Sequence, residues 1–199
     1  MNIIKREDWG MLPPSNSYKS QKANKIIVHH NGAGSKPNIP DFKGKETIRA
    51  IERWHVEVNN WNALGYHFII APNGDIYQGR PIFVRGAHAG YKNNINSIGI
   101  MLYGNFDYEN PTTEQIKALK ELIVHLNIYD IYGHKDVRNT TCPGKNLYKI
   151  IKSEEFTYLN INRNDDNITK PLNDNVKLIN ETIKNLKSVL EILENALPK

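Results

Sequence analysis

Residues 25–30 read Lys-Ile-Ile-Val-His-His, and Asn31-Gly32 follow directly. Three consecutive β-branched side chains that end at polar residues and an Asn-Gly pair are typical of a buried strand that leads into a loop. Side chains on a strand alternate between its two faces, so at most one of His29 and His30 can join a site on a given side. The segment is therefore expected to place a histidine at the end of a buried strand.

Helices and strands alternate around this segment over residues 1–158. Apolar residues recur at helical spacing over 47–58, and Asn73-Gly74 lies between two apolar runs, as in a β-hairpin. The alternation predicts an α/β fold with a central mixed β-sheet flanked by helices. The other expected elements are a helix over 47–58, strands over 66–71, 75–78, 98–103 and 131–134, and an amphipathic helix that opens with a capping box at Thr112.

The 199-residue chain has a formal net charge of +5, and the excess lies in its first part. Residues 1–158 hold 20 basic and 15 acidic side chains, whereas residues 159–199 hold six of each. A basic domain favours an anionic partner, but charge alone does not choose the kind. The chain has no basic helix with interleaved aromatic residues and no run of about 18 apolar residues, so we expect neither nucleic acid nor a membrane as partner.

The C-terminal part differs in pattern from the rest. Residues 159–171 are rich in Asn and Asp and contain a proline, which is typical of a polar linker. From Leu172 to Leu197, apolar residues follow at alternating intervals of four and three, with Lys and Glu on the other faces. This heptad seam predicts a helix over 172–199 that forms a homo-oligomer. A terminal helix packed on its own domain is the alternative, although such a helix normally has a wider apolar stripe.

A single cysteine, Cys142, excludes an intrachain disulfide. Together with His134 it brackets a loop without apolar periodicity. Imidazole and thiolate both suit zinc, but two ligands make only half a site. A third ligand from His29 or His30 would leave a fourth position open for water, as in catalytic zinc sites, whereas a fourth protein ligand would indicate a structural site.

Other aromatic and histidine side chains are candidates for supporting roles. Alternation places Tyr66 on the same strand face as Phe68. From this pattern Tyr66 can be either a core aromatic residue or a catalytic tyrosine. His88 lies in a glycine-rich loop, the usual position of a functional or exposed polar group. His55 is expected to be partly buried with its polar atoms satisfied, and no role is expected for His125.

A known family shares four motifs with the chain: IIVHHNGAG at 26–34, GYHFIIAPNGDIYQGR at 65–80, GAHAGYKNNINSIGIMLYGNF at 86–106 and GHKDVRNTTCPG at 133–144. In this order they resemble the zinc-dependent N-acetylmuramoyl-L-alanine amidases that share a fold with peptidoglycan recognition proteins, phage lysozymes of the amidase kind most closely. The resemblance extends over nearly all of residues 1–158 and not over the tail.

The resemblance implies a groove over one zinc ion per catalytic domain. Some amidases have a lysine at the position of Thr140, so the charge that such a lysine brings to the developing oxyanion is missing here and only a hydroxyl can donate. The implied roles are zinc binding for His29, His134 and Cys142, catalysis for Tyr66 and Thr140, and substrate binding for His88, Asn93 and Asn94.

The implied activity is hydrolysis of the amide between N-acetylmuramic acid and L-alanine in bacterial peptidoglycan. Zinc lowers the pKa of bound water to about 7 and polarises a carbonyl, which suits this reaction. The anionic cell wall also accounts for the location of the positive charge. Two alternatives are a module that binds peptidoglycan without cleaving it and a structural zinc protein assembled through its C-terminal helix.

The first nine residues carry charges where a signal peptide has its apolar stretch. We therefore expect synthesis in the cytoplasm without a signal peptide. As an endolysin from a phage or prophage, the protein would reach the cell wall after release by a holin. An intracellular recycling enzyme is the alternative.

Deletion of residues 172–199 tests the predicted oligomer. Linked catalytic domains bind a polymeric wall with higher avidity, so the deletion should lower the oligomer mass and weaken wall retention while sparing activity on small muropeptides. Light scattering and a cell-wall sedimentation assay measure the two effects. A protein that is monomeric both before and after the deletion contradicts the prediction.

Overall fold

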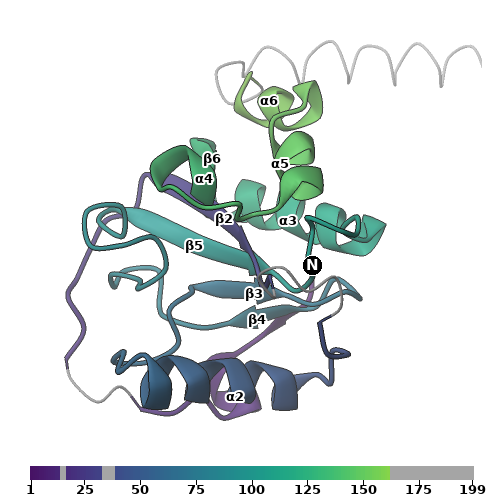
Figure 1. Cartoon of the computed structure of the whole chain (residues 1–199). Helices are drawn as coiled ribbons and strands as arrows, with labels where there is room; N and C mark the ends of the chain where they lie inside the picture. The colour runs from purple at the N-terminus through teal and green to yellow at the C-terminus, as the bar shows by residue number, and fades with distance from the viewer. Residues whose placement is uncertain (14–16, 33–38, 162–199) are drawn as a thin grey trace, which may run out of the picture. The chain divides into compact units, whose positions relative to one another are not determined.

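The computed structural model describes residues 1–13, 17–32 and 39–161 (Figure 1). In chain order its elements are β1 (Ile3–Ile4), α1 (Arg6–Trp9), β2 (Lys25–His30), α2 (Lys45–Arg53), the π-helical turn η1 (Trp54–Val58), β3 (Phe68–Ile70), β4 (Ile76–Gln78), β5 (Ser97–Leu102), α3 (Thr113–Leu126), β6 (Ile131–Gly133), α4 (His134–Val137), α5 (Lys145–Ile151) and α6 (Glu154–Ile161).

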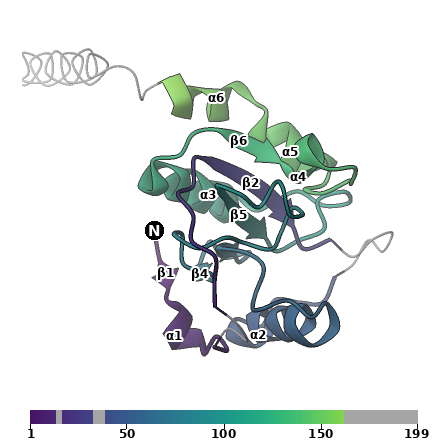
Figure 2. The same cartoon turned by 90° about the vertical axis from the view of Figure 1, so that its left-hand side faces the viewer.

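The strands form one six-stranded sheet in the order β1-β4-β3-β5-β2-β6. The hairpin pair β3 and β4 is antiparallel, and all other neighbours are parallel. Figures 1 and 2 show helices on both sides of the sheet, with α2 on one side and α3 and α5 on the other. The predicted mixed sheet flanked by helices is therefore confirmed, and so is the buried strand at 25–30, whose bounds match the prediction.

Side-chain alternation gives the sheet two apolar faces. On β5, Ile98, Ile100 and Leu102 pack with α3 and α5 in the larger core cluster. The opposite face of β5 presents Met101, which packs with Trp9 of α1 and with α2 in the second cluster. Burying a large apolar side chain contributes about 1.5–3 kcal/mol, so the apolar clusters on both faces stabilise the sheet.

The capping box at the start of α3 is confirmed. The Thr112 hydroxyl accepts a hydrogen bond from the Gln115 N–H at 3.1 Å, and the Gln115 side-chain oxygen accepts one from the Thr112 N–H at 3.0 Å. Gln115 is itself buried, and its amide donates to the Tyr103 carbonyl at 2.9 Å. The cap therefore also joins α3 to the end of β5.

The predicted helix over 47–58 forms, but its second half differs from the expectation. After Arg53 the chain adopts the π-helical turn η1, which has more residues per turn than an α-helix and so rotates the side chains that follow. His55 is buried as a result, while Trp54 is 60% exposed and Val58 is 53% exposed. The apolar stripe is thus correct for Ile48 and wrong for Trp54 and Val58.

The chain divides into a compact unit, Met1–Leu159, and a second unit, Asn160–Lys199. Helix α6 continues through Ile161, so the first residues of the predicted linker are helical. The rest of the linker and the heptad helix over 172–199 lie outside the described residues and stay predictions. In the described part, the chain has no helix of the length and apolar character that a membrane crossing requires.

Candidate functional site

Three side chains converge at the carboxyl edge of the sheet. His29 lies near the end of β2, which pairs in parallel with β5 and β6, and His134 follows β6 directly as the first residue of α4. Ligand atoms of His29, His134 and Cys142 all lie within 4.8 Å of one another. The Cys142 Sγ is 3.7 Å from the His29 Nδ1. The three residues with a predicted metal role are therefore brought together.

The neighbouring histidine takes the other face of β2, as strand alternation predicts. The Nδ1 of His30 accepts a hydrogen bond from the Phe106 N–H at 3.2 Å, on the side of the larger core cluster. The choice between the two histidines, which the strand pattern alone left open, therefore falls on His29.

The three converging side chains suit a metal ion. The Nε2 of His134 is buried and has no hydrogen-bond partner among the residues that the structure describes. Burial lowers the pKa of His29 well below its ordinary value and that of His134 to about 4, so both imidazoles are neutral and each has a free lone pair. Two nitrogens and one sulfur form a donor set that zinc prefers.

Cys142 is held by its own loop and by β2. Its N–H donates to the Thr140 hydroxyl at 3.2 Å, and its sulfur accepts the N–H of His30 at 3.4 Å. Burial raises the pKa of the thiol to about 12, so binding of a metal ion must displace its proton. Thr140, predicted to assist catalysis, thus holds the backbone of Cys142 and still has its hydroxyl hydrogen to donate.

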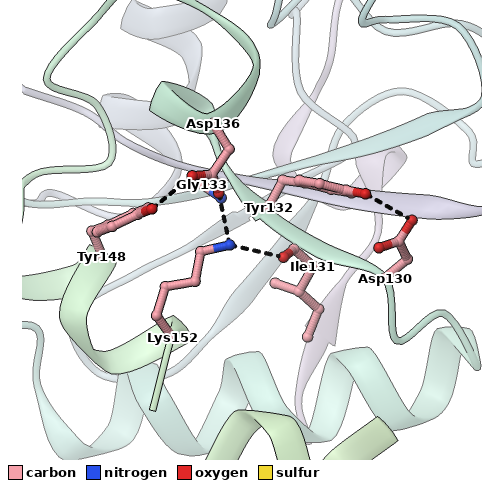
Figure 3. A network of polar contacts seen from close by, with 7 residues as sticks. All are labelled: Asp130, Ile131, Tyr132, Gly133, Asp136, Tyr148 and Lys152. Atoms are coloured by element: carbon pink, nitrogen blue, oxygen red, sulfur yellow. Dashed lines mark hydrogen bonds and ion pairs between the residues drawn. The ribbon is translucent and has the colours of Figure 1, made fainter.

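A polar network fixes the turn that carries His134 (Figure 3). The Asp136 carboxylate accepts the Gly133 N–H at 2.8 Å and the Tyr148 hydroxyl at 2.7 Å, and it pairs with Lys152 at 2.8 Å. Burial alone would raise the pKa of Asp136, but these hydrogen bonds lower it below the ordinary value, so the carboxylate stays charged. The network therefore ties α5 to the start of α4, where His134 lies.

Tyr66 lies beside the converging ligands. Its ring centroid is 5.2 Å from that of His29. Burial, with a smaller contribution from Cys142, raises the pKa of its hydroxyl, which therefore keeps its hydrogen at neutral pH. The predicted strand face of Tyr66 is wrong: β3 begins only at Phe68, so Tyr66 precedes the alternation and packs against the second core cluster instead.

A groove of about 680 Å³ opens next to these ligands. Its walls come from the loop after β2, from one face of α2, from η1 and from the end of β5. Tyr66 lines the groove as well, so this residue joins the groove to the metal ligands. The π-helical turn η1 directs Trp54 and His55 to the groove wall. Trp54, directly after α2, is therefore exposed to the groove and not packed in the core.

His88, Asn93 and Asn94 lie in one loop behind the ligands, and their predicted role in substrate binding stays a prediction. His88 is buried, and its Nδ1 lies 3.0 Å from the His29 Nε2. The Asn94 side-chain oxygen accepts the N–H groups of His88 and Ala89, and the Asn93 amide donates to the carbonyls of Ala89 and Val137. These hydrogen bonds stabilise the 88–94 loop, and the described lining of the groove does not include its side chains.

Sequence reasoning missed Arg80 as a support. Its buried guanidinium donates to the carbonyls of Leu64 at 2.6 Å, Arg85 at 2.8 Å and Ala63 at 3.3 Å. These bonds fix the segment just before Tyr66. The sequence carries no local signal for this role, because Leu64 and Ala63 lie 16 and 17 residues before Arg80.

The chain is similar to known proteins over most of the part that carries these residues. Residues 19–145 match the sequence model of a family described as N-acetylmuramoyl-L-alanine amidase. Peptidoglycan-recognition protein LB of Drosophila melanogaster is 34% identical over 180 residues, which cover 85% of this chain and 76% of the relative. Peptidoglycan recognition protein 1 of Bos taurus is 32% identical over 158 residues, which cover 76% of this chain and 83% of the relative.

Solved structures show the same likeness. A point mutant of Drosophila PGRP-LB in complex with tracheal cytotoxin matches with a TM-score of 0.67 and 32% identity, over 76% of this chain and 93% of that chain. Drosophila peptidoglycan recognition protein SD matches with a TM-score of 0.68 and 29% identity, over 77% of this chain and 94% of that chain.

Burial of histidines outside the ligand set, among them His55 and His67, makes folding stability depend on pH. Burial lowers the pKa of His55 and of His67 to about 4. An unfolded histidine has a pKa of about 6.5, so between these values the unfolded chain binds more protons than the folded one. The free energy of unfolding should therefore fall from about pH 6.5 to 4, by about 1.4 kcal/mol per pH unit for each histidine.

The substitution His55→Gln isolates one of these contributions. Gln retains an acceptor for the Gly65 N–H, which the His55 Nδ1 accepts at 3.1 Å, but cannot titrate. Urea unfolding with a chelator present, from pH 7 to 4.5, should show a slope lower by about 1.4 kcal/mol per pH unit than in the parent protein. The exposed control His125→Gln should keep the parent slope. Equal slopes for all three proteins contradict the prediction.

Proposed function

The chain belongs to the N-acetylmuramoyl-L-alanine amidase family, and from this premise we propose that it is a zinc-dependent hydrolase of the amide between N-acetylmuramic acid and L-alanine in bacterial peptidoglycan. The observation that carries the proposal is the convergence of His29, His134 and Cys142 beside Tyr66 at the wall of a groove. Three protein ligands, rather than four, are typical of catalytic zinc sites.

The ligand residues and Tyr66 have distinct tasks in the proposed reaction. When bound to these ligands, zinc supplies an activated water and a Lewis acid for the amide carbonyl. The Tyr66 hydroxyl stays protonated and donates a hydrogen bond to the oxygen on which negative charge develops. Thr140 holds Cys142 in place, and its own hydroxyl hydrogen is available for the same oxygen.

The groove and the charge of the domain suit a peptidoglycan strand. A relative, PGRP-LE, is solved with tracheal cytotoxin, which its description calls monomeric diaminopimelic acid-type peptidoglycan. Exposed Trp54 offers an aromatic surface in the corresponding domain of this chain, and the net positive charge of residues 1–158 attracts an anionic polymer. We further propose, from the resemblance to phage amidases, that the protein acts on the cell wall as an endolysin.

Recognition without cleavage is the second candidate function. The relatives quoted above are named for recognition of peptidoglycan, and their names do not state cleavage, although the family description does. The complete donor set of His29, His134 and Cys142 next to a protonated Tyr66 supports cleavage, because a binding groove alone needs neither a metal nor a hydrogen-bond donor at this point.

The substitution Tyr66→Phe tests the proposed reaction. The purified parent protein, incubated with cell walls, should release L-alanine amino termini and create no reducing sugar ends. In the Tyr66→Phe variant, loss of the hydrogen-bond donor to the developing negative charge should lower kcat by about 10²- to 10³-fold. Zinc content, measured by mass spectrometry of the metal, should stay at one per chain.

The matched control is Tyr91→Phe, which removes the hydroxyl of an exposed tyrosine and should keep full activity. Undiminished turnover in Tyr66→Phe with zinc bound contradicts the role of Tyr66. A parent protein that binds zinc and peptidoglycan but releases no amino termini contradicts cleavage and favours recognition.

A further inference from the structure

We propose that His88 is a positioning residue of the metal centre: it accepts a hydrogen bond from the Nε2–H of His29 and thereby fixes the tautomer in which the His29 Nδ1 is free to bind metal. The inference rests on the metal site of the proposed function. It assigns to His88 a role in orienting the ligand His29.

The contact between the two histidines is buried and short. The His29 Nε2 lies 3.0 Å from the His88 Nδ1, and the side chains are 1% and 6% exposed. The other ring nitrogen of His29, Nδ1, faces the sulfur of Cys142. A neutral imidazole has one N–H and one lone pair, so the partner of Nε2 decides whether Nδ1 can be a ligand.

A backbone carbonyl sets the direction of the hydrogen-bond chain. The Ser97 hydroxyl lies 2.7 Å from the Asn93 carbonyl, which can only accept, so Ser97 donates there. Its oxygen must then accept from the His88 Nε2, which lies 3.3 Å away. His88 is therefore protonated at Nε2 and accepts at Nδ1, which leaves His29 as the donor between the two rings.

The fold leaves a slot for the His88 ring that only glycine permits. A Cβ on Gly99, in the interior of β5, would lie 2.5 Å from the Cγ and Cδ2 of His88, and a Cβ on Gly86 would lie 2.5 Å from its Cδ2. Asn94 fixes the backbone by accepting the His88 N–H at 2.9 Å. A glycine inside a strand marks a close approach of other atoms, and here the approaching atoms are those of this ring.

The chain of bonds is suited to orientation and not to proton transport. It runs from His29 through His88 and Ser97 and ends at the carbonyl of Asn93, a group that can neither take up nor release a proton. Partners that orient metal-binding histidines typically contribute about 10- to 100-fold to metal affinity. The same range is expected for His88.

The zinc affinity of the full-length chain tests the proposal independently of catalytic activity. It is measured by competition with a chromophoric chelator. His88→Phe keeps a ring in the slot but removes the acceptor, and should raise the Kd for zinc by about 10- to 100-fold. His88→Asn restores an acceptor oxygen and should return the Kd toward the parent value. An unchanged Kd in folded His88→Phe overturns the proposal.

The matched control is His67→Phe. His67 is equally buried and lies against His88, but it bonds to the Gly99 N–H and the Val84 carbonyl and not to a metal ligand. Its loss should lower thermal stability and leave the zinc Kd within about threefold, as expected for a change that misses the ligand contacts. An equal loss of zinc affinity in both Phe variants reports general disruption and overturns the proposal.

Nitrogen-15 NMR of the histidine side chains in the metal-free parent protein gives a direct readout. The His29 ring should carry its hydrogen on Nε2, and a mixture of tautomers should appear in His88→Phe. A hydrogen on Nδ1 of His29 in the parent protein overturns the proposal even if His88→Phe fails to fold. If the parent protein binds zinc and shows the expected tautomer but cleaves no peptidoglycan, only the amidase proposal is contradicted. If it binds no zinc, the amidase proposal and the role of His88 are both contradicted.

Discussion

The parallel pairing of β2 with β5 and β6 is the constraint on which the site depends. In this register, the ends of the three strands meet at one edge of the sheet, so His29 at the end of β2 lies beside the turn after β6 that carries His134. A shift of β2 by one residue would move His29 to the opposite face. Such a shift would also remove Ile26 and Val28 from the larger core cluster, and their burial opposes it.

Burial of many histidines around this edge has a further effect. Each charged imidazole would lose its hydration inside the fold, so burial keeps His29 and His88 neutral, and neutral rings form ordered hydrogen-bond chains with a defined direction. Asp136 has the complementary task on the other ligand, since its charged carboxylate is satisfied by Tyr148 and Lys152 and holds the turn at His134. The ligands are thus oriented from behind by groups that the groove does not reach.

Much of this arrangement follows from local sequence pattern. The strand at 25–30, the hairpin at Asn73-Gly74 and the capping box at Thr112 each depend on neighbouring residues, and all three form as predicted. The pattern could not place Trp54, because a π-helical turn changes the phase of a helix without a clear signal in composition. For His88 the loop composition left a functional and an exposed side chain open, and the structure excludes only exposure, because the glycines of the loop and of β5 allow close approach to the ring.

The central claim is that His29, His134 and Cys142 form one metal centre, and X-ray absorption spectroscopy at the zinc edge of the zinc-loaded chain tests it most directly. The account predicts one sulfur neighbour at about 2.3 Å, two imidazole nitrogens at about 2.0–2.1 Å and one further light atom, four neighbours in all. A first coordination sphere without sulfur, or with a complete set of four protein ligands, would contradict it.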